Sequence, residues 1–154
     1  MMGSMVTTSA QPRVCSVART LEIVGEKWAL LAVREVFLGN RRFDEMVRRI
    51  GAPRDTLASR LRALTGAEIL ERRQYSEHPA RFEYFLTEAG RDLYPVILTL
   101  MRWGDTYLNA GDQPPLVLEH ECGEQLKAQV VCEACGNPAA AGTARPLYRE
   151  SPRS

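Results

Sequence analysis

The residues best suited to chemistry in this chain are two pairs of metal-binding side chains near its C-terminus. One pair stands in the tetrapeptide His-Glu-Cys-Gly and the other in the pentapeptide Cys-Glu-Ala-Cys-Gly. Imidazole nitrogen and thiolate sulfur are ligands of tetrahedral structural zinc, and a Cys-x-x-Cys-Gly turn is typical of a zinc knuckle. We therefore expect that no cofactor is required, and a structural zinc ion is a candidate. Its four candidate ligands are His120, Cys122, Cys132 and Cys135.

The spacing of these pairs leaves a second interpretation open. The first pair has one intervening residue, where a zinc knuckle has two. In this second interpretation, the side chains belong to a small hairpin with reduced structural thiols and no metal. A disulfide is disfavoured, because we expect the chain to lie in the reducing cytoplasm.

Cys15 is the remaining thiol, and it lies at the start of the first predicted helix. The positive end of the helix dipole can lower the pKa of a thiol there and produce a reactive thiolate. A buried, inert cysteine is the competing interpretation, because free cysteines are among the most buried residues in proteins.

Motifs for catalysis are missing from the sequence. The chain has two histidines, no Ser, His and acid grouping that matches a catalytic motif, no Gly-rich phosphate loop and no His-Glu-x-x-His. We interpret Glu22, Glu26 and Glu35 as members of solvated helix faces. The sequence therefore predicts that the chain is not an enzyme.

The length and composition predict one ordinary globular domain. The chain has 154 residues, of which 45% are apolar and 25% charged, as in an average soluble domain. Apolar stretches such as residues 28–33 are far shorter than the ~20 residues that span a bilayer. The first residues also lack the basic and apolar regions of a secretory signal. We expect no membrane segment and no membrane partner.

The spacing of apolar residues predicts two helices and then a helix-turn-helix. Helical periodicity runs over residues 16–24 and 26–38, with Gly25 between them, and again over residues 43–50. Gly51, Ala52 and Pro53 then break the pattern before another helix that ends near residue 66. Two helices joined by such a short turn are a helix-turn-helix.

The periodicity then changes from 3.6 to 2, which predicts a β-hairpin. Two strands, residues 69–75 and 81–86, flank a polar turn at residues 76–80. A hairpin in this place is the wing of a winged helix-turn-helix. Thr87 is the expected N-cap of a long final helix, with Pro95 as a kink or boundary. The apolar residues expected on its inner side are Leu93, Val96, Ile97, Leu100, Trp103 and Leu108.

The fold class is therefore mainly α with a small β-hairpin wing, followed by a short cysteine-bearing C-terminal extension. We expect a disordered leader at residues 1–13 and a winged helix-turn-helix domain for DNA binding and dimerisation at residues 14–111. A small Cys-containing hairpin extension follows at residues 112–138. Residues 139–154 are expected to be a flexible tail.

Arginines are concentrated on the predicted helix-turn-helix and wing. The whole chain carries a net charge of only +1, but ten arginines face six acidic residues between positions 41 and 81. Such a basic middle is typical of a surface that meets phosphates. The second helix of the motif fits a DNA major groove, and Arg54 at its start can read guanine. The candidate residues on this helix are Arg54, Asp55, Thr56, Ser59 and Arg62. We expect phosphate contacts from Arg41, Arg42, Arg72 and Arg81, and a minor-groove contact from the wing tip at His78.

Several segments resemble the HxlR-type winged-helix transcriptional regulators. They are residues 15–28, with the following Leu-Ala-Val-Arg-Glu and Leu-Gly-Asn-Arg-Arg-Phe, and residues 57–64 and 81–90. The resemblance covers about residues 15–107. It implies a cytoplasmic bacterial homodimer that represses or activates nearby genes from a double-stranded operator, with the first and last helices forming the dimer contact. Pro53 stands where many members have Ser, which affects the entry angle of the helix.

The resemblance also implies a signal. In some members the cysteine equivalent to Cys15 senses oxidants or electrophiles, so Cys15 is a redox-sensing candidate and an oxidant or a small molecule is a candidate effector. The alternative function is a protein-interaction module with a zinc-knuckle-like tail and no specific DNA binding. Salt-dependent binding to duplex DNA distinguishes the two functions.

Overall fold

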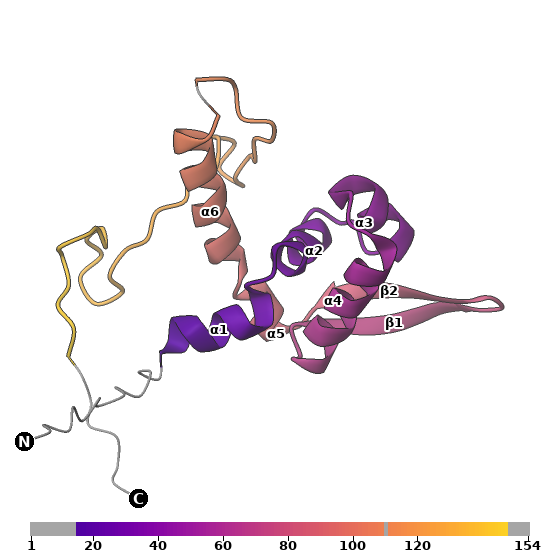
Figure 1. The fold of residues 1–154 in the computed structure, drawn as a ribbon. Coiled ribbons are helices and arrows are strands. Elements are labelled where there is room, and N and C mark those ends of the chain that lie inside the picture. The colour runs from indigo at the N-terminus through magenta and orange to yellow at the C-terminus, as the bar shows by residue number, and fades with distance from the viewer. Residues whose placement is uncertain (1–14, 110, 148–154) are drawn as a thin grey trace, which may run out of the picture. The chain divides into compact units, whose positions relative to one another are not determined.

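The computed structural model describes residues 15–109 and 111–147, which form two compact units that meet at Tyr94 and Pro95. The first unit contains helices α1 to α5 and the hairpin of β1 and β2 (Figure 1). The second unit contains most of α6 and the turns that follow it. The elements are α1 (Ser16–Val24), α2 (Lys27–Phe37), α3 (Phe43–Ile50), α4 (Arg54–Gly66), β1 (Leu70–Glu77), β2 (Ala80–Leu86), α5 (Glu88–Arg91) and α6 (Tyr94–Tyr107). None of these helices combines the length and the apolar character needed to cross a membrane.

The core of the first unit lies between α2 and α4, which pack against each other. Leu57, Leu61 and Leu64 of α4 are fully buried, as the spacing of three and four residues along a helix predicts. Ala32 and Val33 of α2 are equally inaccessible. This packing presents the opposite face of α4 to the surroundings.

The turn between α3 and α4 depends on Gly51. This residue ends α3 in the left-handed conformation, with φ at +71°, and its N–H donates to the Val47 carbonyl at 2.9 Å. Glycine adopts that conformation without steric cost. Pro53 then precedes α4 and supplies no side-chain acceptor to its first turn. The sequence therefore predicts the helix-turn-helix correctly.

The wing is longer than the sequence predicts. β1 and β2 pair in antiparallel register from Leu70 opposite Leu86 to Glu77 opposite Ala80, so only His78 and Pro79 form the turn. The predicted five-residue turn at 76–80 was wrong, because backbone pairing continues through polar residues that give no hydrophobic signal. The ribbon projects away from the helices (Figure 1).

The segment before α3 joins the wing. Arg42 forms a bridge with Glu83 of β2, and the N–H of Tyr84 donates to the Arg41 carbonyl at 2.9 Å. This pairing ties the helix-turn-helix to the hairpin, so the two elements have a fixed relation to each other.

The predicted final helix is divided into α5 and α6. The Thr87 hydroxyl accepts a hydrogen bond from the N–H of Gly90 at 3.0 Å, which confirms the predicted N-cap. Pro95 is the second residue of α6, so the predicted boundary is also confirmed. The prediction of inward-facing residues was wrong at four positions, because a single chain provides nothing to cover them. The exposed fractions are 44% for Val96, 52% for Leu100, 57% for Trp103 and 69% for Leu108, whereas Ile97 is buried.

The boundary between the compact units falls within α6, between Tyr94 and Pro95, whereas the domain predicted from the sequence extends to residue 111. The expected leader, residues 1–13, and the last part of the expected tail lie outside the described residues. The described part of that tail contains a turn in which the Thr143 hydroxyl donates to the Ala140 carbonyl at 2.7 Å.

Candidate nucleic-acid interface

An open groove of about 660 Å³ lies between α3, α4 and the wing. Arginines from all these elements and from the segment before α3 line it, together with two acidic residues, Asp44 and Glu45. The excess of fixed positive charge gives the groove a positive potential that attracts polyanions. The lining arginines are Arg42, Arg48, Arg54, Arg62, Arg72 and Arg81.

Arg54 is the first residue of α4 and lies at the end of the helix that meets the groove. Its Nη2 donates to Oδ1 of Asp44 at 2.8 Å, and its guanidinium lies 4.9 Å from the centre of the Phe43 ring. Both members of this ion pair are well exposed, so the pair is weak and exchanges readily for another anion. Arg54 is thus oriented toward the groove and available for a bidentate contact.

Arg42 is held by both strands of the wing. Its Nε donates to Oε1 of Glu83 at 3.0 Å, and its guanidinium lies 4.5 Å from the Tyr75 ring centre. The hydrogen bond to Glu83 raises the pKa of Arg42 above its ordinary value, so this side chain is charged at every physiological pH.

Arg72 and Arg81 lie on the two strands of the wing. The Arg72 guanidinium lies 4.0 Å from the Phe82 ring centre. Contact with an aromatic face limits the rotamers of a long side chain and leaves its N–H groups free for acceptors. The wing therefore presents oriented guanidinium groups.

The structure brings together five of the ten residues predicted to meet DNA. On α4, the groove is lined by Arg54, Ala58 and Arg62. The predicted Asp55 and Ser59 directly follow two of these residues in the sequence and do not line the groove. Asp55 is exposed, whereas Thr56 and Ser59 are half-buried. The five predicted residues that do not line the groove are Arg41, Asp55, Thr56, Ser59 and His78.

Sequence reasoning did not single out Arg48 and Tyr75 as site residues. Arg48 is exposed on α3 and lines the groove with Arg54. Arg48 is one of the ten arginines between residues 41 and 81, but the helical pattern does not indicate which side of α3 meets the wing. Tyr75 lies at an irregularity of β1, where the register shifts between Gln74 and Ser76.

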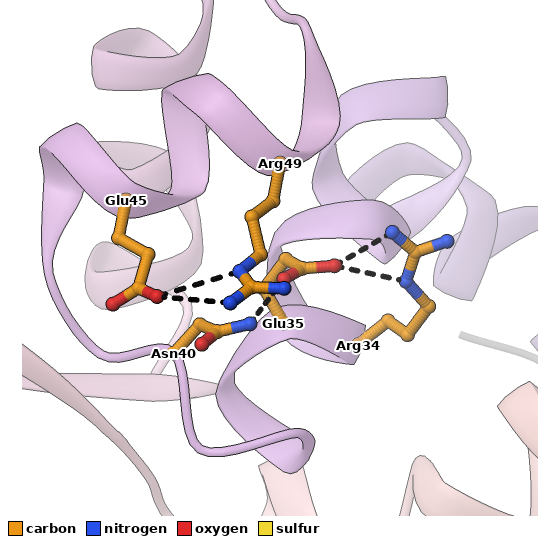
Figure 2. Close-up of polar contacts among 5 residues, drawn as sticks. All are labelled: Arg34, Glu35, Asn40, Glu45 and Arg49. Carbon is orange, nitrogen blue, oxygen red and sulfur yellow. Dashed lines mark hydrogen bonds and ion pairs between the residues drawn. The ribbon is translucent and has the colours of Figure 1, made fainter. Parts of the chain in front are cut away.

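A buried carboxylate fixes the loop that leads to the interface. Glu35 of α2 is 2% exposed and was wrongly interpreted as solvated. Its Oε1 accepts from Nη2 of Arg34 at 2.6 Å, and its Oε2 accepts from Nδ2 of Asn40 at 2.6 Å (Figure 2). The Asn40 N–H also donates to the Glu35 carbonyl at 2.9 Å. The loop folds back over the end of α2, and this burial was not visible in the periodicity.

Cys15 is exposed, so the interpretation of a buried, inert thiol was wrong. It directly precedes α1. The backbone N–H groups of Ala18 and, to a smaller extent, Val17 lower the pKa of the Cys15 thiol below its ordinary value, because they favour the thiolate. The Cys15 thiol is therefore accessible and has a lowered pKa.

The predicted zinc ligands lie on two exposed turns of the second unit. In residues 15–109 and 111–147, no three His, Cys, Asp or Glu side chains are close enough to share one metal ion. The pairs are therefore not brought together, although Cys132 and Cys135 lie in one turn, where the Cys135 N–H donates to the Cys132 carbonyl at 3.3 Å. N–H donation from Ala134 is the largest cause of the lowered pKa of Cys132. Zinc binding remains a prediction.

A helix-turn-helix followed by a two-stranded wing, with arginines gathered between them, defines the winged helix-turn-helix class of DNA-binding proteins. The family model for HxlR-like helix-turn-helix proteins matches residues 23–112, and the chain belongs to this family. The family resemblance and the fold class predicted from the sequence are thereby confirmed.

Relatives and solved structures extend this similarity. The chain is 48% identical over 132 residues to the uncharacterized HTH-type transcriptional regulator Rv3095 of Mycobacterium tuberculosis, covering 85% of this chain and 84% of that protein. The crystal structure of PA1607, described as a candidate transcription factor, has a TM-score of 0.77 at 34% identity and covers 88% of this chain and 95% of that one. The oxidized form of the redox regulator HypR has a TM-score of 0.52 at 34% identity, covering 60% and 96%.

These comparisons show to which functional class of proteins the chain belongs. The family and the similar proteins are transcriptional regulators of the helix-turn-helix type. This chain is therefore a transcriptional regulator, and the prediction that it is not an enzyme is confirmed by its family. The relatives Rv3095 and PA1607 match more of the chain than residues 23–112.

Proposed function

We propose that this regulator binds a dyad-symmetric double-stranded operator as a homodimer in the cytoplasm and thereby represses or activates nearby genes. The observation that carries the proposal is the groove between α3, α4 and the wing, where six arginines and two acidic residues meet. A positive concave surface beside an exposed helix is the form in which winged helix-turn-helix proteins meet DNA.

In this proposal α4 enters the major groove with its N-terminal end first. Arg54 then leaves Asp44 and donates two hydrogen bonds to a guanine edge, which is the commonest specific contact to a base. The exposed pair with Asp44 costs little to break, because water screens both charges. Asp55, Thr56, Ser59 and Arg62 accompany Arg54 on the same helix.

The wing and the segment before α3 supply the sequence-independent contacts. Arg41, Arg42, Arg72 and Arg81 bind phosphates, and Arg48 joins them from α3. The aromatic rings beneath Arg42 and Arg72 reduce the side-chain entropy that binding would otherwise cost. His78 at the tip of the wing lies over the minor groove.

The dimer forms through apolar side chains that a single chain leaves exposed on α1 and α6. Val17 is 65% exposed and Leu21 54%, and Leu100 and Trp103 on α6 are exposed to a similar degree. One large exposed residue is ordinary, but several at helical spacing mark an interaction surface. A second copy is the partner that two half-sites require.

Cys15 is the proposed point at which a signal acts. Its exposed, acidic thiol lies at the start of α1, and α1 belongs to the proposed dimer contact. Oxidation or alkylation there changes the packing of α1 and so the separation of the two α4 helices. The similarity to a protein described as a redox regulator supports this assignment.

The experiment that tests this function is sequencing of genomic fragments bound by the purified protein. The proposal predicts one enriched motif with two related half-sites, spaced by about one helical turn of 10 base pairs or a multiple of it. Fragments without a shared motif would leave the protein-interaction alternative in its place. A single unpaired half-site would contradict the homodimer.

A further inference from the structure

The second unit contains two hairpins with the same pattern of backbone hydrogen bonds. In the first hairpin, residues 118–126, the N–H of His120 donates to the Glu124 carbonyl at 2.9 Å. In the second hairpin, residues 130–139, the N–H of Cys132 donates to the Asn137 carbonyl at 2.8 Å. Each hairpin has a further bridge next to this bond, between Glu119 and Gln125 or between residues 131 and 138.

The metal-binding side chains occupy equivalent places in the two hairpins. His120 and Cys132 each accept a hydrogen bond on their carbonyl from the glycine that ends the turn, at 2.8 and 2.7 Å. Cys122 and Cys135 each come directly before that glycine, which has a positive φ in both hairpins. Each hairpin thus presents one pair of zinc-type ligands at its tip, and all three thiols are exposed.

Contacts inside each tip keep the members of a pair together. In the second hairpin, the N–H of Cys135 donates to the Cys132 carbonyl at 3.3 Å, so both cysteines belong to one tight turn. In the first hairpin, the N–H of Cys122 lies 3.4 Å from Nδ1 of His120, so the imidazole folds over the turn that carries Cys122. The members of each pair therefore lie within one turn of their hairpin.

We propose that the two hairpins are the two halves of one tetrahedral Zn²⁺ site. The structure shows them in an open arrangement, since the described residues contain no set of three ligands around one point. Only residues 127–129 separate the hairpins, so closure of the proposed site requires a reversal of the chain at this connection. The Ala128 carbonyl within the connection accepts from Nη1 of Arg102 on α6 at 2.6 Å, which ties the connection to α6.

The chemistry of the four side chains selects the metal. Three sulfurs and one imidazole nitrogen suit Zn²⁺ and exclude hard cations such as Mg²⁺ and Ca²⁺. Each thiol that becomes a thiolate ligand releases its proton to solvent, so three thiolates and Zn²⁺ give a site of net charge −1. A disulfide between Cys132 and Cys135 alone would not account for the equivalent pair in the first hairpin, His120 and Cys122. The ligands are His120, Cys122, Cys132 and Cys135.

The test is a titration of the reduced full-length protein with Co²⁺, which reports tetrahedral thiolate coordination through its visible absorption. We expect one Co²⁺ per chain, displacement by Zn²⁺, and three sulfur ligands by the intensity of the charge-transfer band. Cys122→Ser, Cys132→Ser and His120→Ala should each weaken binding by more than about 10-fold, because loss of a ligand exceeds the loss of an outer-shell partner. Cys15→Ser is the matched thiol control and should bind normally.

Circular dichroism of each variant should be unchanged over the helical part, because the exposed hairpin tips contribute nothing to its core. The proposal is overturned if Co²⁺ gives no tetrahedral spectrum. It is equally overturned if the spectrum persists in both Cys122→Ser and His120→Ala, since the second hairpin would then bind metal without the first.

Discussion

At the scale of single residues, the proposed role of each arginine in DNA binding depends on the element that carries it. Arg54 extends from the first turn of α4, whereas Arg72 and Arg81 extend from the wing. A helix end reaches base edges in the major groove, and wing residues meet the phosphates beside it. In the proposed complex, Arg54 therefore contacts a base edge, whereas Arg72 and Arg81 contact phosphates.

Arg54→Ala should weaken operator binding by about 1–3 kcal/mol and relax the preference at one base pair. Arg72→Ala or Arg81→Ala should weaken binding to all duplexes alike and reduce the salt slope by about 1. Competition between the operator and single-base variants, measured by fluorescence anisotropy, checks both results. An Arg54→Ala protein with unchanged base preference would mean that another residue reads the sequence.

The acidity of Cys15 predicts a pH profile for alkylation. The N–H groups of Ala18 and Val17 favour the thiolate, so the midpoint of the rate of reaction with iodoacetamide should lie below the ~8.5 of a free cysteine. The measurement uses a chain in which the three tail cysteines are serine. The same chain in denaturant is the control, and an equal or higher midpoint in the folded protein would contradict the assignment of these hydrogen bonds.

At the scale of elements, the connection between α2 and α3 depends on the buried Glu35. Its two carboxylate oxygens satisfy Arg34 and Asn40, and the loop they hold leads to the residues that pair with β2. Removal of the carboxylate leaves these donors without a protein partner, which is costly where water has poor access.

Glu35→Ala should lower the free energy of unfolding by roughly 1–3 kcal/mol. Glu35→Gln should lower the free energy of unfolding by a smaller amount, since its amide oxygen still accepts a hydrogen bond. The matched control is Glu45→Ala, which removes the more exposed pair with Arg49 at 3.4 Å and should cost only about 0.3–0.5 kcal/mol (Figure 2). Urea denaturation measures all three, and equal losses in Glu35→Ala and Glu45→Ala would show that the buried network does not hold the loop.

The helices, the wing and the groove differ in how far the sequence predicts them. α3 and α4 follow from apolar spacing, because each buries or partly buries apolar residues at helical intervals. α1 follows from the same spacing, although Val17 and Leu21 stay exposed in a single chain. The pairing of Arg42 with Glu83 joins residues 41 positions apart, and no local pattern encodes it. Arg42, one member of this pair, lines the groove. The positive charge of the groove was therefore predictable from the sequence, but only five of the ten residues predicted to meet DNA line it. Glu35 was missed because its burial depends on a loop and not on its helix.

At the scale of the whole molecule, the proposed dimer covers the exposed apolar residues on α1 and α6. Leu100→Glu together with Trp103→Glu should convert the proposed dimer into a monomer, because burying two carboxylates in an apolar contact is strongly unfavourable. Both side chains are more than half exposed, so the fold of a single chain should tolerate the change. Sedimentation at micromolar concentration checks the result. A variant that remains dimeric would place the contact on other elements.

The central claim is that the arginine groove binds one DNA sequence in preference to others through phosphate and base contacts. Its most direct test is the affinity for the enriched operator and for a scrambled duplex as a function of salt concentration. Six groove arginines in one copy predict a slope of log affinity against log salt of about −5 or steeper, with the operator bound more tightly throughout. A slope near zero, or equal affinity for both duplexes, would contradict the claim.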